Sequence, residues 1–239
     1  MEPMRLNKYL GEKGVCSRRE ADRLVEQGRI LVNGRPAENG MKVTDSDSIV
    51  VDGKPVEGGK EERVVLAVNK PRGVVCTTAH FHDEKNIVEL VNYPTRLYPV
   101  GRLDKNSEGL VLMTNYGELV NHVLRSRNNH EKEYVVSVNK PVDEEMLEKL
   151  RNGVYLPELE VTTKPCRCYQ TGEYVFHIIL TQGLNRQIRR MCEALDLHVR
   201  RLKRVRIMGI ELGTIPLGGY RKLSESEVRA LMRGSDNEK

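Results

Sequence analysis

Apolar positions along the first 55 or so residues recur first at helical and then at strand spacing. A short helix is predicted over residues 6–10, and Gly14 is placed to end it. A second helix is predicted after Ser17, which has capping-box spacing to the glutamate three residues later, and it ends at Gly28. Asn-Gly at 33–34 and Asp-Gly at 52–53 follow apolar runs and predict tight β-turns. These elements predict a small module of two helices and short hairpins.

The rest of the chain alternates predicted strands with short helices. Residues 64–68 are apolar on both faces, which is typical of a central strand, and the sequence NKPRG at 69–73 interrupts it. Further strands are predicted over residues 74–76, 110–113, 130–138, most of 154–181 and 204–212. Helices are predicted over residues 119–124 and after Ser224, and two more are predicted to begin after the N-cap residues Asp143 and Asn185.

Residues 57–62 separate the two parts of the chain. They are rich in glycine and charge and contain no apolar anchor, which is typical of a flexible linker. A chain of 239 residues is long enough for a small module joined to a medium-sized domain. The expected organisation is therefore a module over residues 1–56, a linker over 57–62 and a larger domain over 63–239.

Positive charge is modest in total but concentrated in two regions. The chain has 39 Lys and Arg against 34 Asp and Glu, a net charge of +5. In the module, Arg18 and Arg19 occupy the first turn of a predicted helix, where the helix dipole disfavours cations. Residues 186–206 hold eight Lys and Arg against two acids. A solvated face usually mixes the signs more evenly, so we interpret both regions as surfaces for an anionic partner such as a phosphate backbone.

The five cysteines lack the spacing of a secreted disulfide framework. Free thiols in a reducing compartment are the better interpretation, so a cytoplasmic protein is expected. Cys166 and Cys168 face one side of a predicted strand without a further Cys or His partner, which favours packing over a zinc site. His80 and His82 are interpreted as loop residues for the same reason. No apolar run has the length of a membrane span.

An aspartate in a glycine-framed loop is the first candidate for chemistry. Residues 98–114 read YPVGRLDKNSEGLVLMT, so two glycines bracket a polar loop in front of a buried strand. Asp104 lies in this loop between Arg102 and Lys105. The neighbouring cations favour a carboxylate anion, which is a potential nucleophile. An Asx-turn or a surface ion pair is the alternative on these residues alone.

Three motifs and the N-terminal module together resemble the pseudouridine synthases, in the branch that carries a small RNA-binding module and modifies ribosomal RNA. The motifs are the Asp104 loop, NKPRG at 69–73 and GLNRQIRRM at 183–191, while residues 5–52 resemble the S4-type RNA-binding module. The resemblance implies an α+β fold. In it, an S4-type module is joined to a catalytic domain with a mixed, largely antiparallel central sheet flanked by helices.

The resemblance also implies roles for individual residues. Asp104 would be the catalytic residue, Arg189 would pair with it, and Tyr134 of the Lys132-Glu133-Tyr134 strand would pack against the target base. By its position in an alternating strand alone, Tyr134 is a core residue. The candidate RNA contacts are Arg5, Lys8, Arg18, Arg19, Arg23, Asn33, Lys70, Arg102, Arg186 and Arg190.

The implied reaction is the isomerisation of a specific uridine to pseudouridine in RNA. Residues 129–134 and 206–218 are most similar to the subgroup that acts on large-subunit (23S) ribosomal RNA, and some of its members also modify a tRNA anticodon uridine. Because nothing is oxidised or hydrolysed overall in this reaction, no cofactor and no metal are expected. No membrane partner is expected either, and the protein is expected to act on RNA as a monomer. One alternative is a non-catalytic RNA-binding or ribosome-assembly protein. Another is a nucleoside hydrolase, although such enzymes normally show a second working carboxylate.

Overall fold

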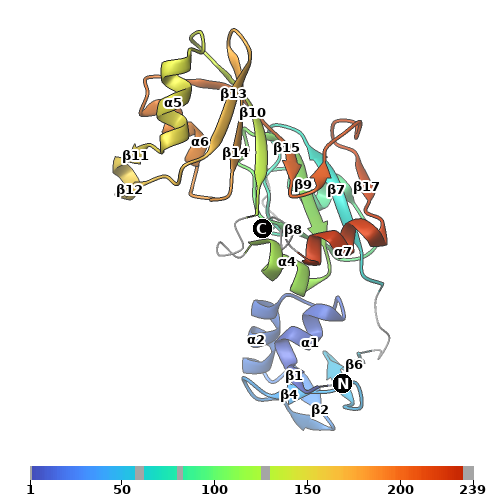
Figure 1. Ribbon diagram of the computed structural model, residues 1–239. Coiled ribbons are helices and arrows are strands. Elements are labelled where there is room, and N and C mark those ends of the chain that lie inside the picture. The colour runs from blue at the N-terminus through green and yellow to red at the C-terminus, as the bar shows by residue number, and fades with distance from the viewer. Residues whose placement is uncertain (1, 57–61, 80–82, 125–129, 234–239) are drawn as a thin grey trace. The chain divides into compact units, whose positions relative to one another are not determined.

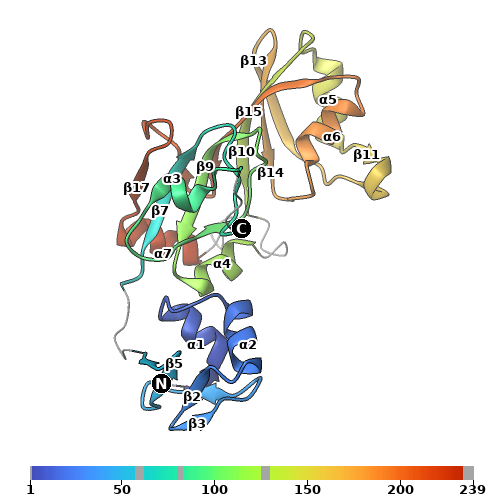
Figure 2. The same cartoon turned by 180° about the vertical axis from the view of Figure 1, so that it is seen from behind.

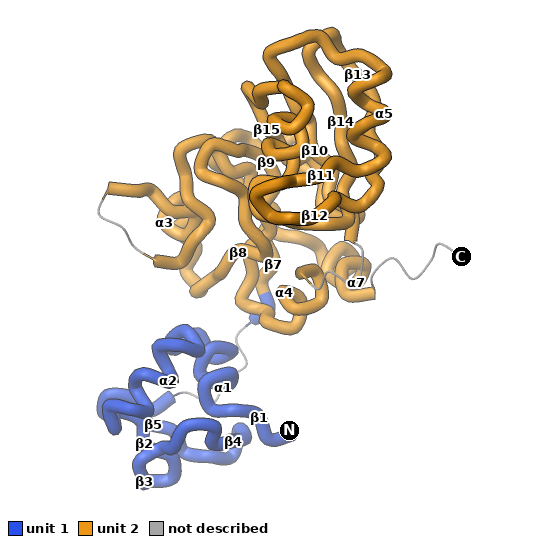
Figure 3. Tube along the Cα trace, turned by 90° about the vertical axis from the view of Figure 1, so that its left-hand side faces the viewer, with its two compact units in different colours: residues 1–63 blue, residues 64–239 orange. Residues whose placement is uncertain are grey.

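The computed structural model describes residues 2–56, 62–79, 83–124 and 130–233. The chain divides into two compact units, residues 1–63 and residues 64–239 (Figure 3). Residues 57–61 of the expected linker lie outside the described residues, as do His80 and His82. Among the helices that are described, none combines the length and the apolar character needed to cross a membrane.

The first unit packs two helices against short strands around its own core. The helices are α1 (Leu6–Glu12) and α2 (Arg18–Glu26), and the strands are β1 (Met4–Arg5), β2 (Ile30–Val32), β3 (Arg35–Pro36), β4 (Lys42–Val43), β5 (Ile49–Val51) and β6 (Lys54–Pro55). Strand β1 pairs with β4, and the other four form a sheet of order β3-β2-β5-β6. Leu10 and Leu24 of the helices meet Ile30 and Ile49 of the strands in the core.

Local sequence signals act in this unit as predicted. The Ser17 hydroxyl accepts a hydrogen bond from the Glu20 N–H and caps α2. Both residues of Asn33-Gly34 and of Asp52-Gly53 have positive φ, the backbone form that a two-residue hairpin turn requires. Each pair connects two antiparallel strands, β2 to β3 and β5 to β6. The two predicted helices and both turns are therefore confirmed.

The second unit, as far as its residues are described, is built on a nine-stranded sheet (Figure 1). Its strands are β7 (Val65–Lys70), β8 (Tyr98–Val100), β9 (Glu108–Thr114), β10 (Lys132–Val138), β13 (Arg167–Gly172), β14 (Val175–Leu180), β15 (Val199–Ile207), β16 (Ile210–Glu211) and β17 (Tyr220–Lys222). The main order is β13-β14-β10-β15-β9-β7-β17, with β16 beside β15 and β8 beside β9. Strands β15 and β9 run parallel, and the other described pairs are antiparallel. The expected mixed, largely antiparallel sheet is confirmed.

Helices pack on this sheet in two groups. They are α3 (Ile87–Val91), α4 (Gly117–Leu124), α5 (Glu144–Asn152), α6 (Gln187–Glu193) and α7 (Glu225–Arg233). Helix α3 covers one face of β7 and β9, and α4 and α7 cover the other (Figures 1 and 2). Helices α5 and α6 cover one face of β10 and β14. A separate hairpin of β11 (Tyr155–Leu156) and β12 (Val161–Thr162), joined by a 3₁₀ turn (Pro157–Leu159), lies between α5 and β13 in the sequence.

Two predicted strands differ from the structure. Residues 74–76 make a single bridge, Val75 with Asn86, instead of a strand, because the backbone of Val75 bonds to the segment at the start of α3: its N–H donates to the Lys85 carbonyl oxygen and its carbonyl oxygen accepts from the Ile87 N–H. The predicted strand over 204–212 is two antiparallel strands, β15 and β16, and β15 already begins at Val199. The chain reverses at Met208, which takes a positive φ of 51°. Methionine is not a usual left-handed residue, so the sequence carried little signal for this turn.

The predicted cap of α6 was wrong. The helix begins at Gln187, and its N-cap residue is Arg186, which is left-handed and makes no side-chain cap. Asn185 instead accepts hydrogen bonds from Arg190, at its carbonyl oxygen and at Oδ1. This arrangement places two arginines, 186 and 189, at the start of α6, where both can reach the neighbouring loop.

Candidate active site

Asp104 lies in the loop between β8 and β9. Glycines with positive φ frame this loop, 77° at Gly101 and 103° at Gly109. Inside it, the Ser107 N–H donates to the Asp104 carbonyl oxygen at 3.0 Å and closes a turn. The Asp104 side chain is about one-third exposed. The glycines and the turn thus hold a partly exposed carboxylate in front of the fully buried strand β9.

Two arginines from the start of α6 face the Asp104 carboxylate. Arg189 Nε lies 3.9 Å and Arg186 Nη1 lies 4.0 Å from Asp104 Oδ2. Both distances are longer than a hydrogen bond, which is no longer formed at about 3.6 Å, so the two cations attract the carboxylate without hydrogen-bonding to this oxygen. Asp104 Oδ2 therefore lies within reach of two guanidinium groups and still stays available for chemistry.

The two arginines differ in how firmly they are held. The Arg189 side chain is 11% exposed. It donates at 3.3 Å to the carbonyl oxygens of Val199 and Asn106 and to the Ser107 hydroxyl. Burial lowers the pKa of the Arg189 guanidinium, repulsion from Arg186 adds to the effect, and Asp104 opposes it. Arg186 is 45% exposed. Arg189 is thus a fixed cation, whereas Arg186 has room to reach a ligand.

Tyr134 lies on β10 and is half-buried. Its ring packs against two hydrophobic clusters, one beneath α5 and α6 and one beneath α3. The Arg204 guanidinium carbon lies 6.0 Å from the ring centre. Strand β15 lies between β10 and β9, so Tyr134 and the Asp104 loop belong to the two strands that flank β15.

Lys70, predicted to contact RNA, does not reach the surface. Its side chain is fully buried at the end of β7. The ammonium group donates to the carbonyl oxygens of Val74 at 2.7 Å, Pro71 at 2.9 Å and Lys105 at 3.4 Å. Burial lowers its pKa. Lys70 therefore ties the loop at 69–73 to the loop that carries Asp104, and it is corrected from an RNA contact to an internal support.

The charged residues of the first unit that were predicted to contact RNA divide into two groups. Arg5, Arg18 and Arg19 are exposed and have no carboxylate partner among the described residues. Lys8 and Arg23 each pair with a glutamate of their own helix. Three of the arginines predicted to contact RNA are therefore available to an anionic partner.

Asn33 has a local structural role. Its amide nitrogen donates to Asp47 Oδ1 at 2.9 Å, and its amide oxygen accepts from the Ser48 N–H at 2.9 Å. These bonds support the turn at 33–34, so the side chain is already occupied. Arg102, in the Asp104 loop, is exposed.

The interpretation of residues 186–206 as one anion-binding surface is corrected by the structure. Arg190 pairs with Glu158, Arg201 pairs with Glu108 at 2.6 Å, and Arg206 pairs with Glu131 and Glu133. Arg204 is buried. The carboxylates come from segments distant in the sequence, which explains why a local count of charges overestimated the free cations.

Arg204 is a site residue that the sequence interpretation missed. It is 3% exposed and lies between the strands that carry the Asp104 loop and Tyr134. The alternation of buried and exposed positions along β15 contained a signal for it, since Arg204 falls in step with buried Leu202. An arginine at a core position of a strand demands an internal partner.

Cys168 on β13 and Cys166, which directly precedes this strand, pack against α5. Cys166 Sγ donates to the Leu150 carbonyl oxygen at 3.1 Å, and Cys168 Sγ donates to the Leu147 carbonyl oxygen at 3.3 Å. Within the part of the chain that the structure describes, no three His, Cys, Asp or Glu residues form a group suited to a metal ion. The packing interpretation of these thiols agrees with their contacts.

Comparison with known proteins gives a consistent result. Residues 64–194 match the model of the family described as RNA pseudouridylate synthase, and residues 4–49 match the S4 domain. The chain is 47% identical over 235 residues to the dual-specificity RNA pseudouridine synthase RluF of Escherichia coli (strain K12), covering 98% of this chain and 80% of that relative. It is 35% identical over 241 residues to the ribosomal large subunit pseudouridine synthase B of Bacillus subtilis (strain 168), covering 98% of each.

A solved structure supports the same relationship. The crystal structure of a pseudouridylate synthase superposes with a TM-score of 0.71 at 28% identity, covering 95% of this chain and 99% of that chain. The family match thus extends from the sequence to the arrangement of the strands and helices. The chain therefore belongs to the RNA pseudouridine synthases, the isomerases that convert uridine to pseudouridine in RNA, and it carries an S4 domain in addition to its synthase domain.

Proposed function

We propose that this enzyme isomerises a specific uridine of large-subunit (23S) ribosomal RNA and that Asp104 is its catalytic residue. The observation that carries the proposal is the Asp104 carboxylate, faced at 3.9 and 4.0 Å by Arg189 and Arg186 in a glycine-framed loop. Relatives named for the ribosomal large subunit support this RNA as the substrate. The dual-specificity name of other relatives supports a second substrate, for which a tRNA anticodon uridine is our candidate.

In the proposed mechanism, Asp104 initiates cleavage of the bond between the sugar carbon C1′ and uracil N1. Its oxygen either attacks C1′, with the bonding electrons leaving on N1, or removes the 2′ proton and expels the base by elimination. The detached uracil turns until its C5 faces the sugar. A C5–C1′ bond then forms, and in the first route the bond between Asp104 and C1′ breaks, whereas in the second route the elimination is reversed and the proton returns to the 2′ carbon. C5 loses a proton and N1 gains one, so the product has the mass of the substrate.

The other residues of the proposed site and the S4 unit have separate roles in catalysis and binding. Arg189 attracts and orients the Asp104 carboxylate, because a buried guanidinium held by three acceptors cannot move away. Tyr134 stacks on the flipped uracil and assists removal of the C5 proton. Arg186, more exposed, contacts the RNA backbone beside the target nucleotide. The S4 unit supplies affinity through Arg5, Arg18 and Arg19, and a single copy of the chain carries the whole site.

The proposal is tested by incubating the enzyme with transcripts of large-subunit ribosomal RNA and of tRNA and then mapping pseudouridine. We expect conversion of a single uridine or a few uridines with no change in RNA mass. Release of free uracil would identify a hydrolase, and tight binding without product would identify a non-catalytic RNA-binding protein. The same mapping of pseudouridine identifies the target nucleotide.

Variants then assign the catalytic residue. Asp104→Asn keeps the size and hydrogen bonding of the side chain but removes its charge, so product should disappear while the fold and the RNA affinity persist. Asp196→Asn, an exposed aspartate paired with Lys140, is the matched control and should keep full activity. Turnover by Asp104→Asn above a control without enzyme would refute the assignment.

A second variant tests whether Asp104 and Arg189 act as one unit. Arg189→Lys keeps a charge but loses the planar fork that reaches Val199, Asn106 and Ser107 together, so turnover should fall strongly. Combined with Asp104→Asn it should cause hardly any further loss, because groups that serve one step are non-additive. Additive losses in the double variant, measured in single-turnover assays, would show that the two residues work separately.

A further inference from the structure

The proposed site has two halves, the Asp104 loop in front of β9 and the Tyr134 ring on β10. Arg204 of β15 pairs in the sheet with a residue of each of these two strands. Strand β15 lies between β9 and β10 in the sheet. Arg204 pairs with Gly109 of β9 on the parallel side and with Tyr134 of β10 on the antiparallel side. Gly109 is the second residue of β9, directly after the loop that carries Asp104. One residue therefore separates the Asp104 loop from the Tyr134 ring.

The backbone of Arg204 lies very close to the end of the Asp104 loop. Gly109 has a φ of +103°, and a Cβ atom added there would lie 2.2 Å from the Arg204 carbonyl oxygen. A side chain at this position would therefore force β15 and β9 apart. The approach fixes the start of β9, and with it the end of the loop, against the Arg204 backbone.

The side chain of Arg204 reaches the other half of the site. Its Nε donates to the Leu110 carbonyl oxygen at 2.7 Å, and its guanidinium carbon lies 6.0 Å from the centre of the Tyr134 ring. Its Nη2 is buried and has no hydrogen-bond partner among the described residues. A guanidinium near an aromatic face gains favourable contact with the ring electrons, which accounts for a buried donor without an oxygen acceptor.

We infer that Arg204 is a positioning residue that sets the distance between the Tyr134 ring and the Asp104 carboxylate. Its backbone holds the end of the Asp104 loop, and its guanidinium supports the ring on which uracil stacks. The inference rests on the proposed function, because it takes Tyr134 as the stacking residue. A role in folding alone would use the same contacts, but every loss of activity would then follow a loss of folded protein.

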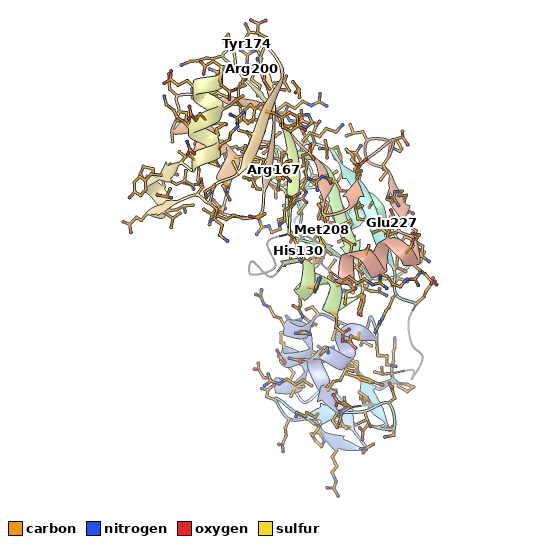
Figure 4. The ribbon with its side chains drawn as sticks, in the orientation of Figure 1. His130, Arg167, Tyr174, Arg200, Met208 and Glu227 are labelled. Carbon is orange, nitrogen blue, oxygen red and sulfur yellow. The ribbon has the colours of Figure 1, made fainter. Side chains whose placement is uncertain are left out.

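The kinetic test compares two substitutions with a control. Arg204→Met keeps a long unbranched side chain and removes the charge and the Nε donor, whereas Arg204→Lys keeps a cation near the ring. For the folded protein we expect kcat of Arg204→Met to fall about 10- to 100-fold, with KM for RNA nearly unchanged and partial recovery in Arg204→Lys. Arg167→Met, on edge strand β13 (Figure 4), should keep wild-type kinetics. An unchanged kcat per folded Arg204→Met molecule would overturn the inference.

The dependence on Tyr134 is tested in a double-mutant cycle. Tyr134→Leu removes the ring, so Arg204→Met added to it should lower kcat by less than about threefold, since a positioning residue has nothing left to position. Equal losses in both backgrounds would overturn the inference. If Arg204→Met does not fold, Arg204→Lys carries the same comparison. Absence of product from the wild-type enzyme would instead refute the proposed function.

A spectroscopic test needs no turnover. The protein is labelled with fluorotyrosine, and the Tyr134 resonance among its nine tyrosines is assigned by its absence in Tyr134→Phe. Arg204→Met should shift this fluorine resonance and leave the others in place, because the cation near the ring is lost. Arg167→Met is again the control. An unmoved Tyr134 resonance in folded Arg204→Met would show that the guanidinium does not act on the ring.

Discussion

At the scale of single residues, Tyr134 combines a packing contact with a proposed catalytic one, and substitutions separate the two. Tyr134→Phe keeps the ring and removes the hydroxyl, so RNA binding should survive while proton removal from C5 slows. Tyr134→Ala also removes the ring and should cost about 1–3 kcal/mol of base stacking. Binding assays with single-turnover kinetics measure both effects. Thermal unfolding is the control, since a variant that melts at room temperature would show that Tyr134 serves the core.

Lys70 shows what a single buried charge contributes to the structure around a site. In Lys70→Met three carbonyl oxygens lose the same donor, so we expect the free energy of unfolding to fall by roughly 2–4 kcal/mol. Urea denaturation measures this loss. Lys140→Met, which removes an exposed lysine paired with Asp196, should change stability by less than about 0.5 kcal/mol. A Lys70→Met variant as stable as the wild type would contradict the internal role.

At the scale of elements, α7 is fastened to the sheet by Glu227 (Figure 4). Its carboxylate accepts two hydrogen bonds from Arg221 of β17, at 2.7 and 2.9 Å, and one from the Ser224 N–H at 2.8 Å. The hydrogen bonds from Arg221 lower the pKa of Glu227 to about 2, against the opposing effect of burial. The charged carboxylate therefore stabilises the fold at neutral pH.

The sign of the pH dependence follows from this lowered pKa. The Glu227 carboxylate binds a proton more readily in the unfolded chain than in the folded chain. Its contribution to the free energy of unfolding is therefore complete above about pH 4.5 and is lost as the pH falls towards 2. Glu227→Gln should lower the free energy of unfolding by roughly 1–3 kcal/mol at pH 7, and the difference from wild type should shrink below pH 4. Glu225→Gln, at an exposed position of the same helix, is the control. A difference that stays constant with pH would argue against the ion pair.

Features that depend on neighbouring residues in the sequence were predictable, whereas features that depend on contacts with distant residues were not. Ser17 and Asp143 cap their helices as predicted because a cap needs only the next few residues. The cap of α6 was misassigned because Arg186 takes a left-handed backbone that its own residue type does not favour. Lys70 looked like a surface cation because its acceptors include the carbonyl oxygen of Lys105, 35 residues away.

In the proposed site, too, some features were predictable from neighbouring residues and others depend on distant contacts. The Asp104 loop was visible through its two glycines, whose positive φ depends on local backbone geometry. The part played by Arg204 depends on a parallel pairing with Gly109, which a sequence does not reveal. Counting charges over residues 186–206 failed for the same reason, since the carboxylates of Glu108 and Glu133 lie on other strands.

At the scale of the whole molecule, the two units have separate cores and, we propose, separate tasks. Replacing Arg18 and Arg19 together with Ala should weaken RNA binding and reduce the salt slope of the binding constant by about two, since each neutralised phosphate releases roughly one counterion. Catalysis at saturating RNA should be unaffected. Arg29→Ala, which removes an arginine already bound to Asp52, is the control. An unchanged slope in the double variant, measured in a salt titration, would show that α2 does not face the RNA.

The position of β15 between β9 and β10 also bears on how the enzyme is made. Strands β9 and β10 follow each other along the chain, but in the sheet they do not pair with each other, because β15, which ends at Ile207, lies between them. During translation, Asp104 and Tyr134 leave the ribosome early and remain on two partial sheets with open edges. Contacts between residues so far apart in sequence form late and slowly. We therefore expect the nascent enzyme to stay inactive, and in need of chaperone protection, until β15 has been synthesised.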